Sequence, residues 1–151
     1  MSDLAFLSPG PAPAVSPLAH ALAGADGIRD LSLLGKLEVR GAGAAAVAGA
    51  LAITDRRALV VCEPGRRERL LRELPGFVVD VTAAYAGVEV EGETLLRRLT
   101  DLDLDALPAA GKVAGVPALL ERDGSRFRIW FPQELGESVV EVVRDATAGL
   151  P

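Results

Sequence analysis

Reactive side chains are scarce in this sequence. The 151-residue chain has one histidine, His20, and one cysteine, Cys62. A site with two histidine ligands, an intrachain disulfide and a CxxC metal or redox site are therefore excluded. A Ser-His-Asp triad would have to use His20, and no partner nucleophile is evident. We interpret His20 as a surface or packing residue, and Cys62, within an apolar run, as a buried structural thiol.

Two groups of charged residues could bind ions. Asp101, Asp103 and Asp105 alternate with leucines, but the glycine turn and late glutamate of a calcium loop are missing, so a solvated edge is favoured. Four arginines within 66–72 could hold a phosphate. Interleaved glutamates favour helical ion pairing instead. The segment Gly41–Gly43 lacks a full nucleotide-loop pattern and is interpreted as a tight turn.

One aromatic and basic pair could anchor a partner. Arg128 and Trp130 alternate with Phe127, Ile129 and Phe131, so the two sets face opposite sides of a strand. If the phenylalanine face is in the core, the only tryptophan lies on the outer face beside an arginine, which is a common interface anchor. The alternative is that a helix of the same domain covers Trp130.

Composition narrows the class of protein. Half of the residues are apolar, the formal net charge is −5 and the isoelectric point is about 4.9. These values argue against a nucleic-acid binder or a polybasic membrane binder. No apolar run approaches the ~20 residues that span a bilayer, no secretory signal is evident, and a lone thiol fits a reducing compartment. We expect a cytoplasmic protein without a metal site.

Hydrophobic periodicity predicts the elements that must position these residues. Residues 8–17 hold four of the ten prolines and predict an extended arm, either loose or lying on a partner chain. We divide the chain into an arm, 1–17, and a single domain, 18–151. The predicted strands are 33–40, 57–63, 77–81, 85–91, 112–122 and 126–131, and the predicted helices are 42–51, 64–74, 93–100 and one opened by Pro132. The last helix has a predicted buried stripe of Leu135, Val139, Val142, Val143 and Ala146.

The two halves of the domain resemble each other. The string LEVRG, Leu37–Gly41, matches VEVEG, Val88–Gly92, and LVVCEP, Leu59–Pro64, matches FRIWFP, Phe127–Pro132. Each matched string is a predicted strand followed by a helix, in the same order in both halves. The repeat predicts two α+β half-units that share one core, with mainly antiparallel strands.

These segments resemble a known superfamily. The segment Asp30–Gly41 is similar to the opening of the folate-binding domain of the glycine-cleavage T-protein (aminomethyltransferase), and Leu59–Leu74 and Val88–Thr100 continue the match. Ser16–His20 and Val113–Gly124 look more like the gamma subunit of heterotetrameric sarcosine oxidase. The resemblance implies an α+β fold of two swapped β-α-β half-units with mainly antiparallel sheets.

The sequence departs from the T-protein at the positions that carry its chemistry. That family holds tetrahydrofolate in a central funnel and transfers an aminomethyl-derived carbon to it. Its acidic segment is reduced here to Ala52–Arg57, so the catalytic aspartate has no counterpart. The position of its pterin-binding glutamate falls on Arg128, and a guanidinium cannot accept the pterin's N–H donors.

The resemblance therefore implies a non-catalytic, gamma-type subunit of a sarcosine-oxidase-like complex that oxidises N-methyl amines. Flavin is expected on larger partner subunits, and no cofactor is expected in this chain. The candidate contacts with a ligand or partner are Arg128, Trp130, Tyr85 and Arg40. One alternative is a small folate-binding or folate-dependent aminomethyltransferase-like protein that holds tetrahydrofolate. Another is a stand-alone, homo-oligomeric domain.

Overall fold

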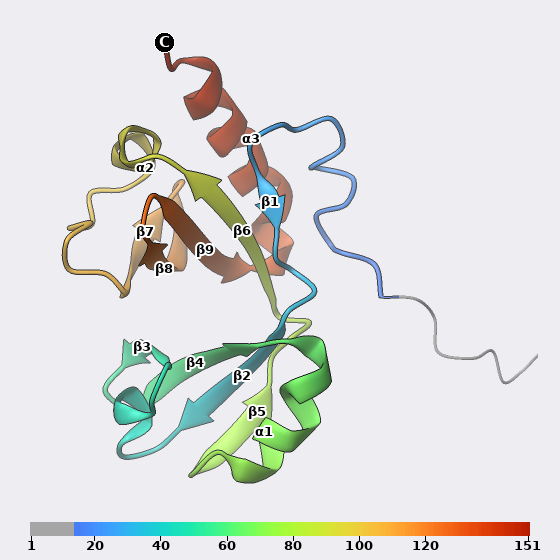
Figure 1. Ribbon diagram of the computed structural model, residues 1–151, viewed down its shortest axis with the longest axis vertical. Helices are drawn as coiled ribbons and strands as arrows, with labels where there is room; N and C mark the ends of the chain where they lie inside the picture. The colour runs from blue at the N-terminus through green and yellow to red at the C-terminus, as the bar shows by residue number, and fades with distance from the viewer. Residues whose placement is uncertain (1–13) are drawn as a thin grey trace, which may run out of the picture.

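The computed structural model describes residues 14–151, so most of the predicted arm, residues 1–13, lies outside the described residues. The described chain forms two antiparallel sheets and three α-helices (Figure 1). The five-stranded sheet has the order β1-β6-β9-β8-β7. Its strands are β1 (Arg29–Asp30), β6 (Tyr85–Glu91), β7 (Ala109–Val113), β8 (Val116–Asp123) and β9 (Arg126–Pro132).

The second sheet has four strands in the order β3-β4-β2-β5. Its strands are β2 (Gly35–Arg40), β3 (Leu51–Thr54), β4 (Arg57–Cys62) and β5 (Phe77–Asp80). The helices are α1 (Arg67–Glu73), α2 (Glu93–Leu99) and α3 (Gly136–Ala148). The chain starts in the five-stranded sheet at β1, passes through the four-stranded sheet and returns at β6 (Figure 1).

The internal repeat is visible in the strand pairing. The first string of each matched pair lies on β2 and β4, which are antiparallel neighbours. The second string of each pair lies on β6 and β9, which are also antiparallel neighbours. The predicted α+β class with mainly antiparallel sheets is therefore confirmed.

Apolar side chains fill three layers. The largest layer lies between the five-stranded sheet and helices α2 and α3, and a second joins the four-stranded sheet to α1. A third, smaller layer joins the two sheets and consists of Leu31, Leu51, Leu59, Leu119 and Trp130. Both sheets are therefore covered on two faces, which alternating strand patterns do not predict.

Two predicted elements are wrong. The segment 42–51 is not an alanine-rich helix but a 3-10 turn, Ala44–Ala46, followed by β3. Gly43 and Gly49 interrupt it with φ angles of 82° and 74°, which a right-handed helix does not allow. The segment 112–122 is two strands rather than one, because Ala114 and Gly115 have φ angles of 50° and 83°. Both positive angles fit a two-residue hairpin turn between β7 and β8.

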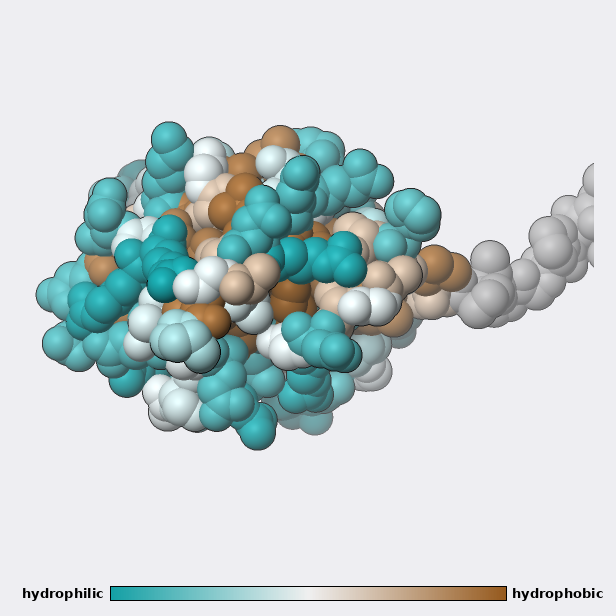
Figure 2. Space-filling model, turned by 90° about the horizontal axis from the view of Figure 1, so that it is seen from above, coloured by the Kyte–Doolittle hydropathy of each residue, from teal (hydrophilic) through white to brown (hydrophobic). Residues whose placement is uncertain are grey.

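Figure 2 shows apolar residues in a broken central patch of one face, surrounded by hydrophilic side chains. No helix within residues 14–151 has the length and hydropathy needed to cross a membrane.

Helix α3 packs on the five-stranded sheet, and its buried stripe contains Val140 in place of the predicted Val142. Val139, Val140 and Val143 are buried, whereas Val142 is 38% exposed. We expect Val139→Ala to lower the free energy of unfolding by about 1 to 3 kcal/mol, because it leaves a cavity among buried neighbours. Val142→Ala is the matched control, with an expected change within about 0.5 kcal/mol. Urea unfolding measures both, and equal effects would contradict the assigned stripe.

Candidate functional site

The layer between the two sheets contains charged residues that the strand pattern assigns to the solvent face. Lys36 and Glu38 lie on β2 with exposed fractions of 0% and 1%. They are buried because the five-stranded sheet covers this face of β2, whereas Leu37 and Val39 pack on the opposite side. The inter-sheet layer therefore contains buried charged groups.

Lys36 is enclosed by the backbone and an aromatic ring. Its Nζ donates a hydrogen bond to the Ser32 carbonyl oxygen at 2.5 Å and lies 5.9 Å from the centre of the Trp130 ring. Burial lowers the pKa of Lys36 from 10.5 to about 8, and the negative charges of Asp30 and Asp80 oppose this shift. Lys36 is fully buried, and it does not line the cleft beside Tyr85 that is described below.

Glu38 is held by two arginines. The Nε atoms of Arg40 and Arg57 each donate to Glu38 Oε1 at 2.7 Å, and Arg57 Nη2 donates to Oε2 at 3.2 Å. The hydrogen bonds from Arg57 hold the pKa of Glu38 below its ordinary value, although burial opposes them. The predicted contact residue Arg40 thus has a structural partner and is still partly exposed.

Acid should weaken the fold through this carboxylate. Because its pKa is lower in the folded than in the unfolded state, its stabilising effect is present above the unfolded pKa and is lost as the pH falls through the folded pKa. We expect Glu38→Gln to lower stability by about 1 to 3 kcal/mol at pH 7, and the difference from the wild type to shrink toward pH 3.

The matched control is Glu73→Gln. It removes an exposed i, i+4 pair with Arg69, which is worth at most about 0.5 kcal/mol. Chemical unfolding over this pH range measures both variants. A constant difference between Glu38→Gln and the wild type at every pH would contradict the role of the Glu38 charge.

Trp130 fills the centre of the inter-sheet layer. Its side chain is 0% exposed, so the prediction of an exposed Arg–Trp anchor is wrong for this residue. The phenylalanine face of β9 does lie in the core, but the four-stranded sheet, rather than a helix, covers the other face. The ring lies against Gly87, its cross-strand partner on β6. Trp130 is therefore a core residue.

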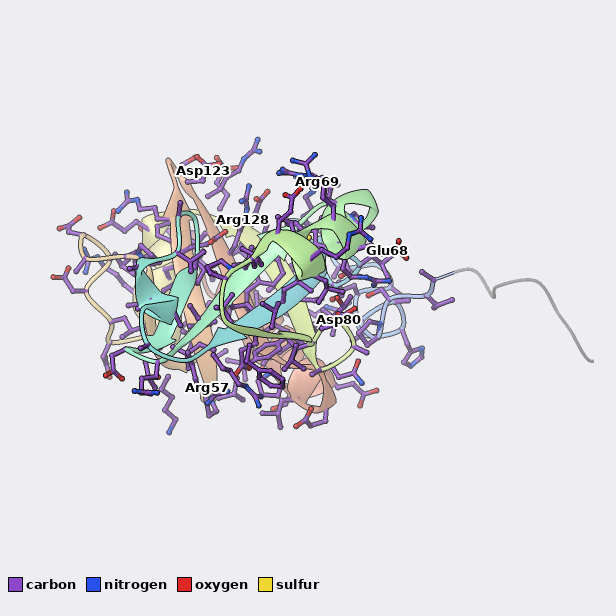
Figure 3. All side chains as sticks on the ribbon, turned by 90° about the horizontal axis from the view of Figure 1, so that it is seen from below. Arg57, Glu68, Arg69, Asp80, Asp123 and Arg128 are labelled. Carbon is purple, nitrogen blue, oxygen red and sulfur yellow. The ribbon has the colours of Figure 1, made fainter. Side chains whose placement is uncertain are left out.

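Arg128 lies at one open side of this layer. Its guanidinium donates to Glu89 at 2.9 Å and Glu121 at 3.3 Å, and lies 3.6 Å from Asp123. Figure 3 shows Arg128 beside Asp123 on one side of the molecule and Arg57 on the opposite side. The hydrogen bond from Arg128 holds the pKa of Glu89 below its ordinary value. The Arg128 charge is thus neutralised within the chain.

This arrangement does not fit a pterin at the Arg128 position. A pterin presents N–H donors, which need a carboxylate acceptor. The residue present is a cation, and the two carboxylates nearest to it, Glu89 and Glu121, are already hydrogen-bonded to it.

Tyr85 lies at the other side of Trp130, where the sheets separate into a cleft of about 510 Å³. The ring is half-buried, and burial raises the pKa of its hydroxyl. Tyr85 pairs with Pro132 at the ends of β6 and β9, and both residues line the cleft. Of the four predicted contact residues, the structure thus places Tyr85 at the cleft and Arg128 at the far side of the layer.

The remaining candidates are structural or exposed. Asp101, Asp103 and Asp105 are exposed on an irregular segment between α2 and β7. Within residues 14–151 no group of three or more metal-binding side chains comes together. Burial raises the pKa of the Cys62 thiol, and His20 is exposed. The predicted helical ion pairing of the arginines is present as Arg69 to Glu73, with an Nε to Oε1 distance of 3.0 Å.

Sequence reasoning missed most of the cleft. Ile53, Ala110, Lys112 and Pro117 line it, although they come from three separate strands. Their types carry no signal of a site, because alanine, proline and isoleucine are ordinary strand and turn residues. Only the pairing of the strands brings them together.

The chain matches no protein-family model and no curated protein sequence. Among solved structures, it is similar to a chain of the heterotetrameric sarcosine oxidase from Corynebacterium sp. U-96 in complex with pyrrole 2-carboxylate. The TM-score is 0.74 at 22% sequence identity, and the match covers 89% of this chain and 95% of that chain. The chain therefore has the fold of that sarcosine oxidase chain.

A second solved structure is the ligand-free regulatory subunit of aspartate kinase from Thermus thermophilus. Its TM-score is 0.46 at 16% identity, over 80% of this chain and 97% of that chain. A likeness of this size does not define a common fold. The likeness to the sarcosine oxidase chain, at 22% identity, is a similarity of fold.

Proposed function

We propose that this chain is a non-catalytic, gamma-type subunit of a heterotetrameric sarcosine-oxidase-like complex. In this proposal the larger subunits carry flavin and oxidise an N-methyl amine, the one-carbon unit passes to tetrahydrofolate on a partner, and the complex works in the cytoplasm. The observation that carries the proposal is the fold match, which spans 89% of this chain and 95% of a chain from an enzyme of that kind.

The electrostatics of the inter-sheet layer support a structural role. The buried carboxylates Glu38 and Glu89 are each held by arginines, and Lys36 is sealed from the surface. Groups that act on a substrate need access and a free proton or lone pair. Glu38 instead pairs with Arg40 and Arg57 of its own sheet, and Glu89 pairs with Arg128 of the other sheet, so each carboxylate stabilises the strand pairing within one sheet.

The proposed contact with a larger subunit includes Arg40 and Phe77. These residues are cross-strand partners at the end of β2 and β5, and Phe77 is 65% exposed. Aromatic and arginine side chains are enriched among the residues that dominate binding energy at interfaces. The pairing of an arginine with an exposed aromatic, which the sequence predicted for Trp130, is thus found at Phe77.

Co-expression with the larger subunits of such an oxidase from the same source tests the proposal. We expect the tagged chain to co-purify with them in a flavin-containing complex. Phe77→Asp should reduce the yield of the complex, whereas Val142→Asp, an exposed substitution on α3, should leave it unchanged. Failure of the wild-type chain to co-purify would overturn the proposal.

The alternatives have separate tests. Saturable, micromolar binding of tetrahydrofolate to the isolated chain in calorimetry would favour a folate-binding protein. A stable homo-oligomer in light scattering, with no complex on co-expression, would favour a stand-alone domain.

A further inference from the structure

The open side of the inter-sheet layer is shaped for a small ligand. The cleft beside Tyr85 has a volume of about 510 Å³, which lies within the ~300–1,000 Å³ range of small-molecule sites. Its lining includes the small residues Ala110 and Gly111 on the edge strand of the five-stranded sheet, and Ile53 of the four-stranded sheet lines the same cleft.

The chemistry of the lining is uneven. Most lining residues are apolar, and among them only Tyr85 and Lys112 carry polar side-chain groups. Lys112 forms no ion pair with a carboxylate of residues 14–151, unlike most of the arginines around the inter-sheet layer. An apolar site with one free cation at its rim favours a ligand that is apolar over most of its surface and carries one negative charge.

We propose that this cleft binds a compact aromatic anion, with one or two rings between the sheets and its acidic group at Lys112. The rings pack on Ile53, Leu119 and Pro117, and Tyr85 supplies the second polar side chain of the lining. This site lies across Trp130 from Arg128. It is therefore separate from the position that the folate resemblance assigns to a pterin.

Fluorescence titration of the isolated full-length chain tests the proposal with two probes, anilinonaphthalene sulfonate and the uncharged N-phenylnaphthylamine. We expect one saturable site for each probe. Ala110→Phe fills the cleft and should raise both dissociation constants by about tenfold or more. Ala52→Phe is the matched control, since Ala52 is exposed on β3 but points away from the cleft, and it should bind as the wild type does.

Lys112→Gln separates charge from shape. It should weaken the sulfonate probe by about tenfold and change the uncharged probe by no more than about twofold. Since Lys112 is exposed, this variant keeps the fold and decides the proposal even if Ala110→Phe lowers the melting temperature. Equal effects of Lys112→Gln on both probes, or unchanged binding in a folded Ala110→Phe, would overturn it.

Light scattering of the same samples tests whether a second copy of this chain occupies the cleft instead. A dimer that Ala110→Phe disrupts would overturn the proposal, because it would show that the cleft is an interface between copies of this chain. The titration uses the chain alone, so its outcome is independent of the co-expression test of the proposed function.

Discussion

Gly87→Ala is expected to destabilise this protein by about 3 kcal/mol or more. A Cβ atom at residue 87 would overlap Cζ3 and Cε3 of Trp130. The indole cannot move aside, because it is 0% exposed and closed in by the second sheet. The Gly87 backbone is also fixed, since its N–H donates to the Ser32 hydroxyl at 3.2 Å and its carbonyl accepts from the Leu31 N–H at 2.8 Å.

Three further variants make this prediction specific. Gly65→Ala is the matched control, because a Cβ there meets no atom within 4 Å, and it should be neutral or slightly stabilising. Trp130→Leu alone should cost about 3 kcal/mol through a cavity. The double variant Gly87→Ala, Trp130→Leu should then be more stable than the sum of the two losses predicts.

Urea unfolding measures the stabilities of the wild type and of the four variants. Strict additivity of the two substitutions would contradict a direct contact between Gly87 and Trp130 as the cause of the loss.

Lys36→Met, in contrast to Gly87→Ala, should raise the free energy of unfolding at pH 7 by about 1 to 3 kcal/mol. The lysine is fully buried, and its pKa of about 8 in the folded chain against 10.5 for the free side chain shows that the charged form is disfavoured there. Methionine has a similar length and no charge to desolvate. The variant loses the hydrogen bond from Nζ to Ser32, the cation–π contact with the Trp130 ring and the attraction of Asp30 and Asp80.

The pH dependence gives a second readout. Between pH 8 and 10.5 the unfolded chain binds more protons at Lys36 than the folded chain does. The contribution of Lys36 to stability therefore rises with pH in that window. The advantage of Lys36→Met should shrink as the pH rises from 7 to 9.5.

Tyr85 and Cys62 also titrate in alkali. Both residues are present in the wild type and in Lys36→Met, so the difference in stability between these two proteins reports the effect of Lys36. A Lys36→Met variant less stable than the wild type at pH 7 would show that the ammonium, held near Ser32 and the Trp130 ring, is a net stabilising group.

Much of the fold follows from local patterns. Alternating apolar residues mark β2, β6 and β9, because side chains alternate between the two faces of a strand, and a continuous apolar run marks β4. The Asp123-Gly124 signal locates the turn between β8 and β9 near its position in the structure. The internal repeat is visible because equivalent strands bury similar residues. The resemblance to a sarcosine oxidase subunit rests on the order of these same segments.

The local errors have local causes. The segment 42–51 is rich in alanine, the best helix former, yet Gly43 and Gly49 interrupt it with left-handed backbone angles. The turn at Ala114 and Gly115 lies inside an apolar run and has only one glycine to mark it. In both segments, residues with left-handed backbone angles interrupt the predicted element.

What covers the second face of each sheet cannot be read from the pattern along one strand. In the sequence, Lys36 and Glu38 alternate as solvent-facing residues do, and Trp130 stands where an exposed anchor is predicted. In the structure, the other sheet covers all three residues. The amino-acid sequence by itself does determine the α+β class, the repeat and the scarcity of reactive groups. Burial of those charges and the cleft at Tyr85 depend on how two sheets pack, because their neighbours are tens of residues away in the chain.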